Sequence, residues 1–390
     1  MMLFVLALIG ALRMAGAQEP AAPQAVPAAQ LQAAIDELGD LDYATRTNAA
    51  RAVRRTPGAQ AVPALLQAVG EHRDGYVRYR ALVLLTGFND PRTKDVMRES
   101  ISSPNDRLRA VAYSFFEHNP DPMMAPSLVA ALEKEQAEFV RPALIRALAA
   151  VGSSVAVQQA LIRDVTRGED FFRSVVIEAL GDYKAMYAFD AVTAVAKLNG
   201  PLQDDAALTL GKMGNKRALE TLAALQRSAS RAVQPSIAAA ICLLEVNCNT
   251  HENYLTETLK FADKNQNLGF QDLLRNAATG LGTLGVAGHP EAVEELFEVG
   301  LPATDDSTRA PVALALGAVA LRNTALMLPI LGKHAKRAEA IGLLAEGFDM
   351  LEEDLDKERF FAVVRRTYWD SPDGSPTRAL MQTLIGKLEF

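Results

Sequence analysis

Regularly spaced arginines are the first candidates for a functional role in this chain. The first five are separated by 32, 31, 32 and 32 residues, and two more follow at the extension of the same phase. We call these seven residues the arginine ladder: Arg46, Arg78, Arg109, Arg141, Arg173, Arg309 and Arg337. Aligned guanidinium groups can bind carboxylates or phosphates. However, Asp, Asn or Glu stands four residues before five of them, so we expect the ladder to pair with acids and hold repeats in register.

Two cysteines, Cys242 and Cys248, are the next candidates, because an even number of cysteines in an exported protein favours a disulfide. On one continuous helix their Cα atoms would be about 9 Å apart, which is too far for a disulfide. A bond therefore requires the helix to end near Val246. The alternative is a buried free thiol, because Cys242 follows the apolar repeat position Ile241.

Motifs for catalysis or metal binding are missing from the sequence. It has no glycine-rich phosphate loop, no H-E-x-x-H helix and no G-x-S-x-G elbow. The acidic run from Asp349 to Glu358 lacks the alternating ligands and the glycine of a calcium loop, so we interpret it as a solvated segment between helices. The sequence therefore predicts no catalytic residue, no metal ligand and no cofactor.

The elements that position these residues are predicted to be helices in a repeat of about 32 residues. Gln203, Gln234 and Leu274 stand where further ladder positions would fall. With the seven arginines they give ten repeat marks, one for each repeat. The residues three and seven positions after each mark are all apolar. A unit this short cannot bury its apolar stripe alone and must stack on its neighbours. We expect an all-α, right-handed α-solenoid of about ten two-helix repeats over residues 31–368.

One repeat shows the pattern most fully, from Asp305 to Gly317 (DDSTRAPVALALG). Its acid–x3–Arg entry and A-L-G ending resemble short bacterial HEAT-like repeats, the class that includes the phycobilisome-lyase-like repeats. The resemblance implies a scaffold, an adaptor or, in a few members, an enzyme. A HEAT-like hydroxylase family binds two irons through several His-Glu dipeptides, but His251-Glu252 is the only one here. We therefore expect neither iron chemistry nor lyase activity.

The two ends of the chain differ from the repeats. An apolar run from Leu3 to Leu12, too short for a membrane span of roughly 20 residues, precedes Ala15-Gly16-Ala17. This pattern predicts a signal peptide over residues 1–17, cleaved after Ala17, and a periplasmic or secreted protein. A Pro/Ala-rich linker is expected over residues 18–30. Residues 369–390, which begin with the single tryptophan, are predicted to cap the last repeat.

The repeat is interrupted once, between Gln234 and Leu274, where the interval is 40 residues. Insertions in a stacked array emerge as loops on one face, often the binding face. We therefore predict a partner-binding loop there, with exposed polar and aromatic groups. Its candidate contact residues are Asn247, Asn249, His251 and Tyr254.

The charge of the chain limits its partners. A formal net charge of −7 argues against a nucleic-acid groove, which needs a basic footprint. Beyond the amino terminus, no stretch is apolar enough to span a membrane. The sequence predicts an exported, non-enzymatic scaffold or adaptor that binds a protein or peptide on its concave face. The alternative is a cell-envelope enzyme or cofactor-handling protein with a site near residues 246–254.

Overall fold

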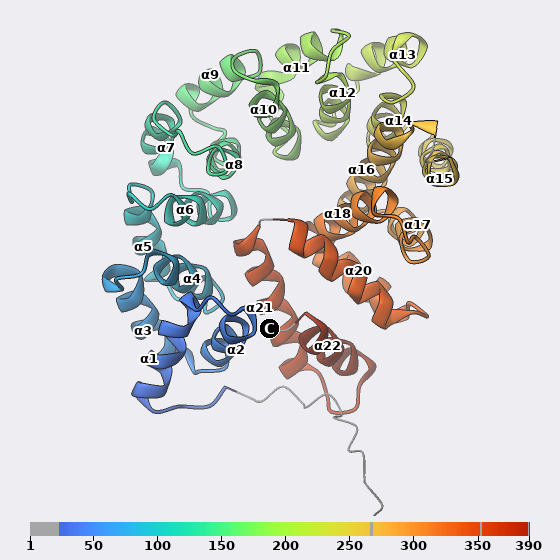
Figure 1. Ribbon diagram of the computed structural model, residues 1–390. Helices are drawn as coiled ribbons and strands as arrows, with labels where there is room; N and C mark the ends of the chain where they lie inside the picture. Colours follow the sequence, from blue (N-terminus) through green and yellow to red (C-terminus); the bar gives the residue numbers. More distant parts are fainter. Residues whose placement is uncertain (1–22, 266–267, 352, 389) are drawn as a thin grey trace, which may run out of the picture.

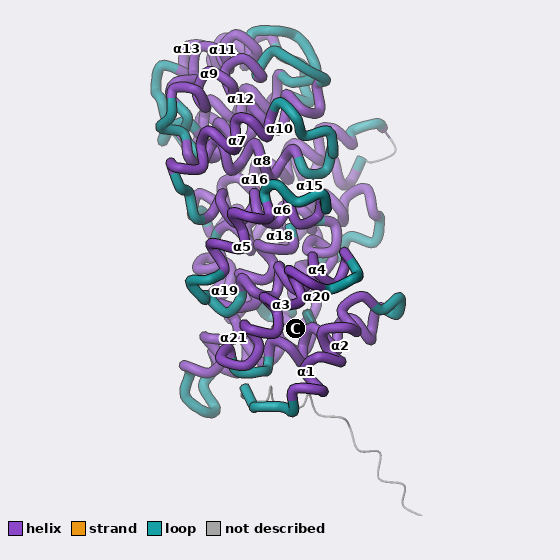
Figure 2. The backbone as a smooth tube through the Cα atoms, turned by 90° about the vertical axis from the view of Figure 1, so that its left-hand side faces the viewer, coloured by secondary structure: helices purple, strands orange, loops and turns teal. Residues whose placement is uncertain are grey.

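The computed structural model describes residues 23–390 except 266, 267, 352 and 389. Over these residues the chain forms helices and no strand. The helices stack in two curved layers that bend almost into a ring (Figure 1). A view turned by 90° shows that the helices cross the stack and that the loops gather along its two edges (Figure 2). The predicted all-α solenoid is confirmed.

The inner layer consists of the helices that carry the ten predicted repeat marks. They are α2 (Tyr43–Arg54), α4 (Gly75–Thr86), α6 (Asp106–His118), α8 (Arg141–Val151), α10 (Asp170–Asp182), α12 (Gln203–Lys212), α14 (Gln234–Leu243), α16 (Gln271–Ala287), α18 (Asp306–Arg322) and α20 (Arg337–Met350). All twenty apolar positions that define the repeat are buried. The inner helices therefore form because each presents one apolar stripe to its neighbours.

The outer layer is made of the helices that alternate with these. They are α1 (Ala28–Asp36), α3 (Gly58–Glu71), α5 (Thr93–Ser100), α7 (Ala125–Leu132), α9 (Val155–Asp164), α11 (Phe189–Ala196), α13 (Ala218–Ser228), α15 (Cys248–Lys264), α17 (Pro290–Gly300) and α19 (Thr324–Lys333). Short 3-10 turns lie at Glu37–Gly39, Pro122–Met124 and Met186–Ala188. No single helix of the described residues has the length and composition of a membrane span, but α18 and α19 together do, with a bend of 118°.

Side-chain caps begin several inner helices. Asp42, Asp74 and Asp305 each accept a hydrogen bond of 2.8 Å from a backbone N–H in the first turn of the following helix. Asn105 accepts one of 3.0 Å from the N–H of Arg107. These contacts satisfy N–H groups that have no partner inside the helix.

The arginine ladder points back from each inner helix to the element before it. Arg78 donates to the carbonyl of Val69 at 2.7 Å, and Arg173 donates to that of Val165 at 3.0 Å. Six ladder arginines make such a bond to a backbone carbonyl: Arg46, Arg78, Arg109, Arg173, Arg309 and Arg337. Carbonyls near helix carboxyl ends lack intrahelical partners, so the ladder supplies the missing donors.

The ladder pairs with acids at three positions, and none of the three partners is the residue four positions before the arginine. Arg109 binds Glu135, Arg173 binds Asp170 and Arg309 binds Glu346 at 2.6–2.8 Å. Arg141 instead lies over the ring of Phe172, with its guanidinium carbon 3.9 Å from the ring centroid. The carbonyl contact is thus the more general one, because every repeat offers a helix end at this place and only some offer a carboxylate.

The interruption of the repeat is helical, so the prediction of a loop there is wrong. α15 runs from Cys248 to Lys264 and buries Leu255, Leu259 and Ala262 at helical spacing. The extra residues thus lengthen a helix, because they carry an apolar stripe of their own. Asn249, His251 and Tyr254 lie on α15, and Asn247 directly precedes it. Partner binding by these residues stays a prediction.

The ends of the chain depart from the plain stack. The predicted signal peptide lies outside the described residues, and α1 begins inside the expected linker. At the other end, α21 (Asp354–Asp370) lies inside the ring between the first and last repeats, and α22 (Pro376–Lys387) packs against α20 and α21 (Figure 1). Trp369, at the end of α21, is 37% exposed and lies edge-on against Tyr368.

Candidate functional site

The start of α21 places acidic side chains against the inner helices, so the prediction of a solvated segment at 349–358 is wrong. Glu358 is the most deeply placed. Its carboxylate lies 2.7 Å from the guanidinium of Arg54 on α2 and 3.2 Å from that of Arg365, and its side chain is 1% exposed. Arg54 and Glu358 are 304 residues apart in the sequence. We call this contact between α21 and the first repeats the junction.

Further acids of this segment find partners around the ring. Asp356 lies 2.7 Å from His118 on α6, and Glu353 lies 2.7 Å from Arg322 on α18. Asp354 accepts a hydrogen bond from the hydroxyl of Tyr79. Burial alone would raise the pKa of Glu358, but Arg54 and Arg365 hold that pKa below its usual range. The acidic amino-terminal end of α21 thus fills part of the concave face of the same chain.

A second group of polar side chains joins the inner helices from α6 to α12. The hydroxyl of Tyr183 donates to Glu117 at 2.8 Å, and Ser174 donates to Asp205 at 2.6 Å. Burial raises the pKa of Glu117, and it raises that of Asp205 to about 6. Both carboxylates bind a side chain of another repeat, so this group connects repeats to one another.

A row of aromatic and arginine side chains follows the amino-terminal ends of the inner helices α2 to α10. We call it the aromatic edge and define it as Tyr43, Tyr76, Arg107, Phe139 and Phe171, each two or three residues before a ladder arginine. Tyr43, Phe139 and Phe171 are 64%, 50% and 59% exposed. Our sequence prediction missed this row, although its offset of two or three residues from the ladder could have revealed it.

The middle of the aromatic edge opens into a pocket of about 580 Å³ between the first repeats and α21. Tyr76, Arg107 and Phe139 of the edge line it together with Arg80 and Arg146. The acidic side chains that line the same pocket are Glu117, Asp349, Glu353, Asp354 and Asp356. The guanidinium carbon of Arg107 lies 5.7 Å from the centroid of the Tyr76 ring. Aromatic rings and arginines therefore border a hollow that is large enough for peptide side chains.

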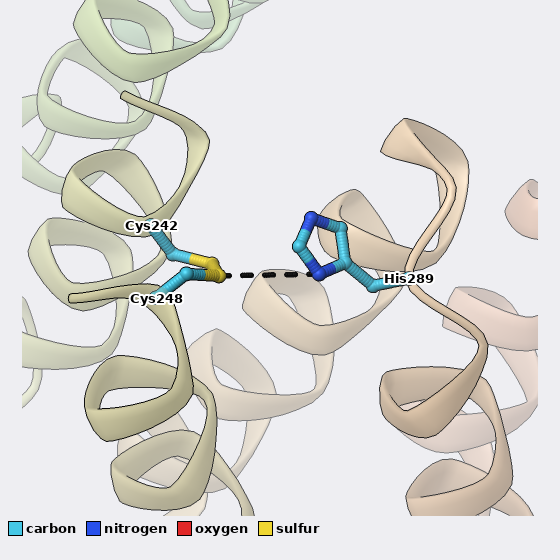
Figure 3. Close-up of side chains that lie close together, drawn as sticks. All are labelled: Cys242, Cys248 and His289. Carbon is cyan, nitrogen blue, oxygen red and sulfur yellow. Dashed lines mark hydrogen bonds between the residues drawn. A yellow bond between two sulfur atoms is a disulfide. The ribbon is translucent and has the colours of Figure 1, made fainter. Parts of the chain in front are cut away.

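The two cysteines meet on the far side of the ring from the aromatic edge. A disulfide joins Cys242, near the end of α14, to Cys248, the first residue of α15 (Figure 3). Nδ1 of His289 lies 3.9 Å from Sγ of Cys248. His251, the other predicted contact in this region, lies on α15 and is not part of this group. We return to this cluster below.

Comparison with known proteins identifies the repeat. The family model described as HEAT repeats matches residues 31–117. No curated protein matches the chain. The match and the solenoid together support a HEAT-repeat family. The phycobilisome-lyase-like subgroup stays a prediction.

Several solved structures share the helical arrangement at low similarity. Importin beta, crystallised in ammonium sulfate, is 14% identical, with 92% of this chain and 55% of that chain covered and a TM-score of 0.39. An engineered protein is 15% identical, with 92% of this chain and 99% of that chain covered and a TM-score of 0.29. Human deoxyhypusine hydroxylase in complex with glycerol is 17% identical, with 59% of this chain and 94% of that chain covered and a TM-score of 0.28. Likeness of this size does not extend to function.

Proposed function

We propose that this protein is a non-enzymatic scaffold that binds a protein or peptide partner at the aromatic edge and its pocket, on the rim of the concave face. The observation that carries the proposal is the row of exposed tyrosine, phenylalanine and arginine side chains. These residue types supply most of the binding energy at protein interfaces. Here they stand at the ends of stacked helices, so little ordering is needed when a partner binds.

The junction supports the choice of partner chemistry. There, arginine and histidine side chains of the inner helices already bind the acidic end of a helix, through Glu358 and Asp356. The neighbouring pocket is lined by Arg80, Arg107 and Arg146 and also by acidic side chains, of which Asp354 and Glu353 already face Arg80 and Arg146. Arg107 lies instead over the rings of Tyr76 and Tyr79. We therefore propose that the partner presents an aromatic or aliphatic anchor beside an acidic side chain that reaches Arg107.

The test compares two surfaces of the same molecule. The double variant Phe139→Ala, Phe171→Ala removes two exposed rings of the aromatic edge, whereas Met123→Ala and Val155→Ala remove exposed apolar side chains where outer helices begin. Partners captured by the unaltered protein should be identified, and their dissociation constants measured for each variant. We expect the edge variant to bind at least about tenfold more weakly, the cost of roughly 1.4 kcal/mol. Equal affinities would place the binding surface elsewhere.

Export is part of the proposal and rests on the sequence between Leu3 and Ala17. Amino-terminal sequencing of the protein from fractionated cells should give a chain that starts at or near Gln18, in the envelope or outside the cell. A cytoplasmic chain that still starts at Met1 would remove this part of the proposal and leave the binding surface untouched.

A second candidate function is cofactor handling near residues 246–254. The group of Cys242, Cys248 and His289 lies at that place and favours it. A metal and chromophore assay of the purified protein in its disulfide-bonded form separates the two candidates, because a scaffold needs no stoichiometric cofactor in that form.

A further inference from the structure

We propose that Cys242, Cys248, His289 and Glu252 form a binding site for a thiophilic divalent cation of the zinc class when the disulfide is reduced. Both sulfurs and a ring nitrogen of His289 lie within 4.8 Å of one another. The imidazole of His289 faces the two sulfurs across a short gap (Figure 3). Cysteine, histidine and carboxylate groups are the usual ligands of zinc in proteins.

The distances suit an ion placed between these donors. Zinc lies about 2.3 Å from sulfur and about 2.0–2.1 Å from nitrogen in tetrahedral sites, which sets the separation of two such ligands at roughly 3.6 Å. Sγ of Cys248 and Nδ1 of His289 are 3.9 Å apart. A shift of a few tenths of an ångström would thus bring both to an ion, and the two sulfurs would separate once their bond is broken.

Glu252 supplies the fourth donor. Its Oε2 lies 3.7 Å from Nδ1 of His289, and its side chain is 13% exposed. Its Oε1 is buried and has no hydrogen-bond partner among the described residues. The carboxylate and the sulfur face the same ring nitrogen, whereas a catalytic relay through histidine uses its two different nitrogens. The carboxylate of Glu252 does not lie within 4.8 Å of all three other donors, so its side chain must move toward the sulfurs to share the ion.

The four donors come from two consecutive repeats. Cys242 and Cys248 flank the turn between α14 and α15, Glu252 lies one helical turn into α15, and His289 directly precedes α17. Two non-glycine residues of the turn, Glu245 and Asn247, have left-handed backbone angles with φ of 60° and 44°. Such angles cost free energy and persist where the surroundings require them. Here they bring the two cysteines together, and an ion would link the two repeats.

The disulfide controls the site. A dithiol reductant supplies two electrons and two protons, so that the S–S bond becomes two thiols and the reductant becomes a disulfide. Zinc then binds the two sulfurs as thiolates, and the two thiol protons are released to solution. A disulfide oxidant reverses both steps: it takes up the two electrons and becomes two thiolates, the S–S bond of the protein forms again, and the ion is released. In the oxidised protein the sulfurs are not available as thiolate ligands.

The test is a zinc titration of the whole protein in two redox states. Protein reduced with a phosphine, and protein left oxidised, are each titrated with zinc alone in competition with a chromophoric chelator. We expect one zinc per reduced chain and none per oxidised chain. Cobalt(II) in place of zinc should give the thiolate-to-cobalt absorption band. Zinc should also raise the melting temperature of the reduced protein only, because the ion binds the folded state.

Variants identify the ligands. His289→Ala should weaken zinc binding at least about a hundredfold, and Glu252→Gln should weaken it about tenfold, the size found when groups around a zinc site are removed. His251→Ala is the matched control, because His251 neighbours Glu252 on α15 but lies outside the cluster. That variant should bind as the unaltered protein does. Helix content is checked by circular dichroism, and His289→Gln replaces His289→Ala if the latter unfolds.

Two results would overturn the proposal. One is a reduced, folded protein that binds no zinc. The other is zinc binding that is unchanged in the folded His289 variant, because the ion would then be held elsewhere. Either result leaves the aromatic edge unaffected, since that surface lies on other repeats.

Discussion

The junction and the aromatic edge both lie on the inner helices of the first repeats, but their side chains are in opposite states of exposure. At the junction, the side chains of Arg54 and Glu358 are 6% and 1% exposed. At the edge, Phe139 and Phe171 are 50% and 59% exposed. The junction already has its ligand, which is the chain's own α21. The comparison teaches that this inner surface can hold an acidic helix, and that the edge is the part left without one.

The largest expected effect comes from breaking the junction. Glu358→Gln should lower the free energy of unfolding by about 3–5 kcal/mol, because it leaves Arg54 and Arg365 buried beside a neutral group. Urea unfolding followed by circular dichroism measures the change. Glu133→Gln, in an exposed pair with Arg163, is the control and should have little effect. A loss as small in Glu358→Gln would mean that buried charge does not hold the ring closed.

A smaller effect is expected at Asp205, on α12 beyond the last helix of the aromatic edge. Burial raises its pKa in the folded protein to about 6, from the usual 3.8. The folded protein then holds a proton that the unfolded chain releases, so stability should fall as pH rises from about 4 to about 6. Asp205→Asn should remove this fall and raise stability at pH 7 by about 1–3 kcal/mol. Unfolding curves at several pH values measure it. A parallel decline in the variant would assign the pH dependence to another group.

Arg141 and Phe139 sharpen the comparison, because they are neighbours with different expected roles. Arg141→Ala should cost about 1–2 kcal/mol of stability through the loss of its contact with the Phe172 ring, and it should leave partner affinity unchanged. Phe139→Ala should do the reverse, since its ring is half exposed. Thermal melts and binding isotherms of both variants test this. If Arg141→Ala melts normally and loses the partner, the arginine ladder belongs to the binding surface.

The sequence was sufficient for the features that depend on local periodicity. Each inner helix has its apolar stripe within seven residues of one of the ten repeat marks. The stack could therefore be predicted without knowledge of distant contacts. The junction could not, because it joins Arg54 to a residue 304 positions away. No local pattern states that the acidic run at 349–358 turns back into the ring.

The structure differs from the sequence predictions at α15 and at the cysteine cluster, for separate reasons. Polar residues on the exposed face of α15 gave its first turns the composition of a loop, whereas the apolar spacing of Leu255, Leu259 and Ala262 marks a helix. The cysteines left a disulfide and a free thiol open, and the structure has the bond. His289 could not be added to them from the sequence, because it lies 41 residues beyond Cys248.

The most direct test of the central claim is site-specific photo-crosslinking from the two edges of the stack. A crosslinking residue is placed at Phe139, before the amino end of α8, or at Val155, beyond its carboxyl end and 66% exposed. If the aromatic edge binds the partner, the partner should be joined covalently to the chain labelled at Phe139 and not to the chain labelled at Val155. Crosslinking from Val155 alone, with the partner still captured, would contradict the proposal.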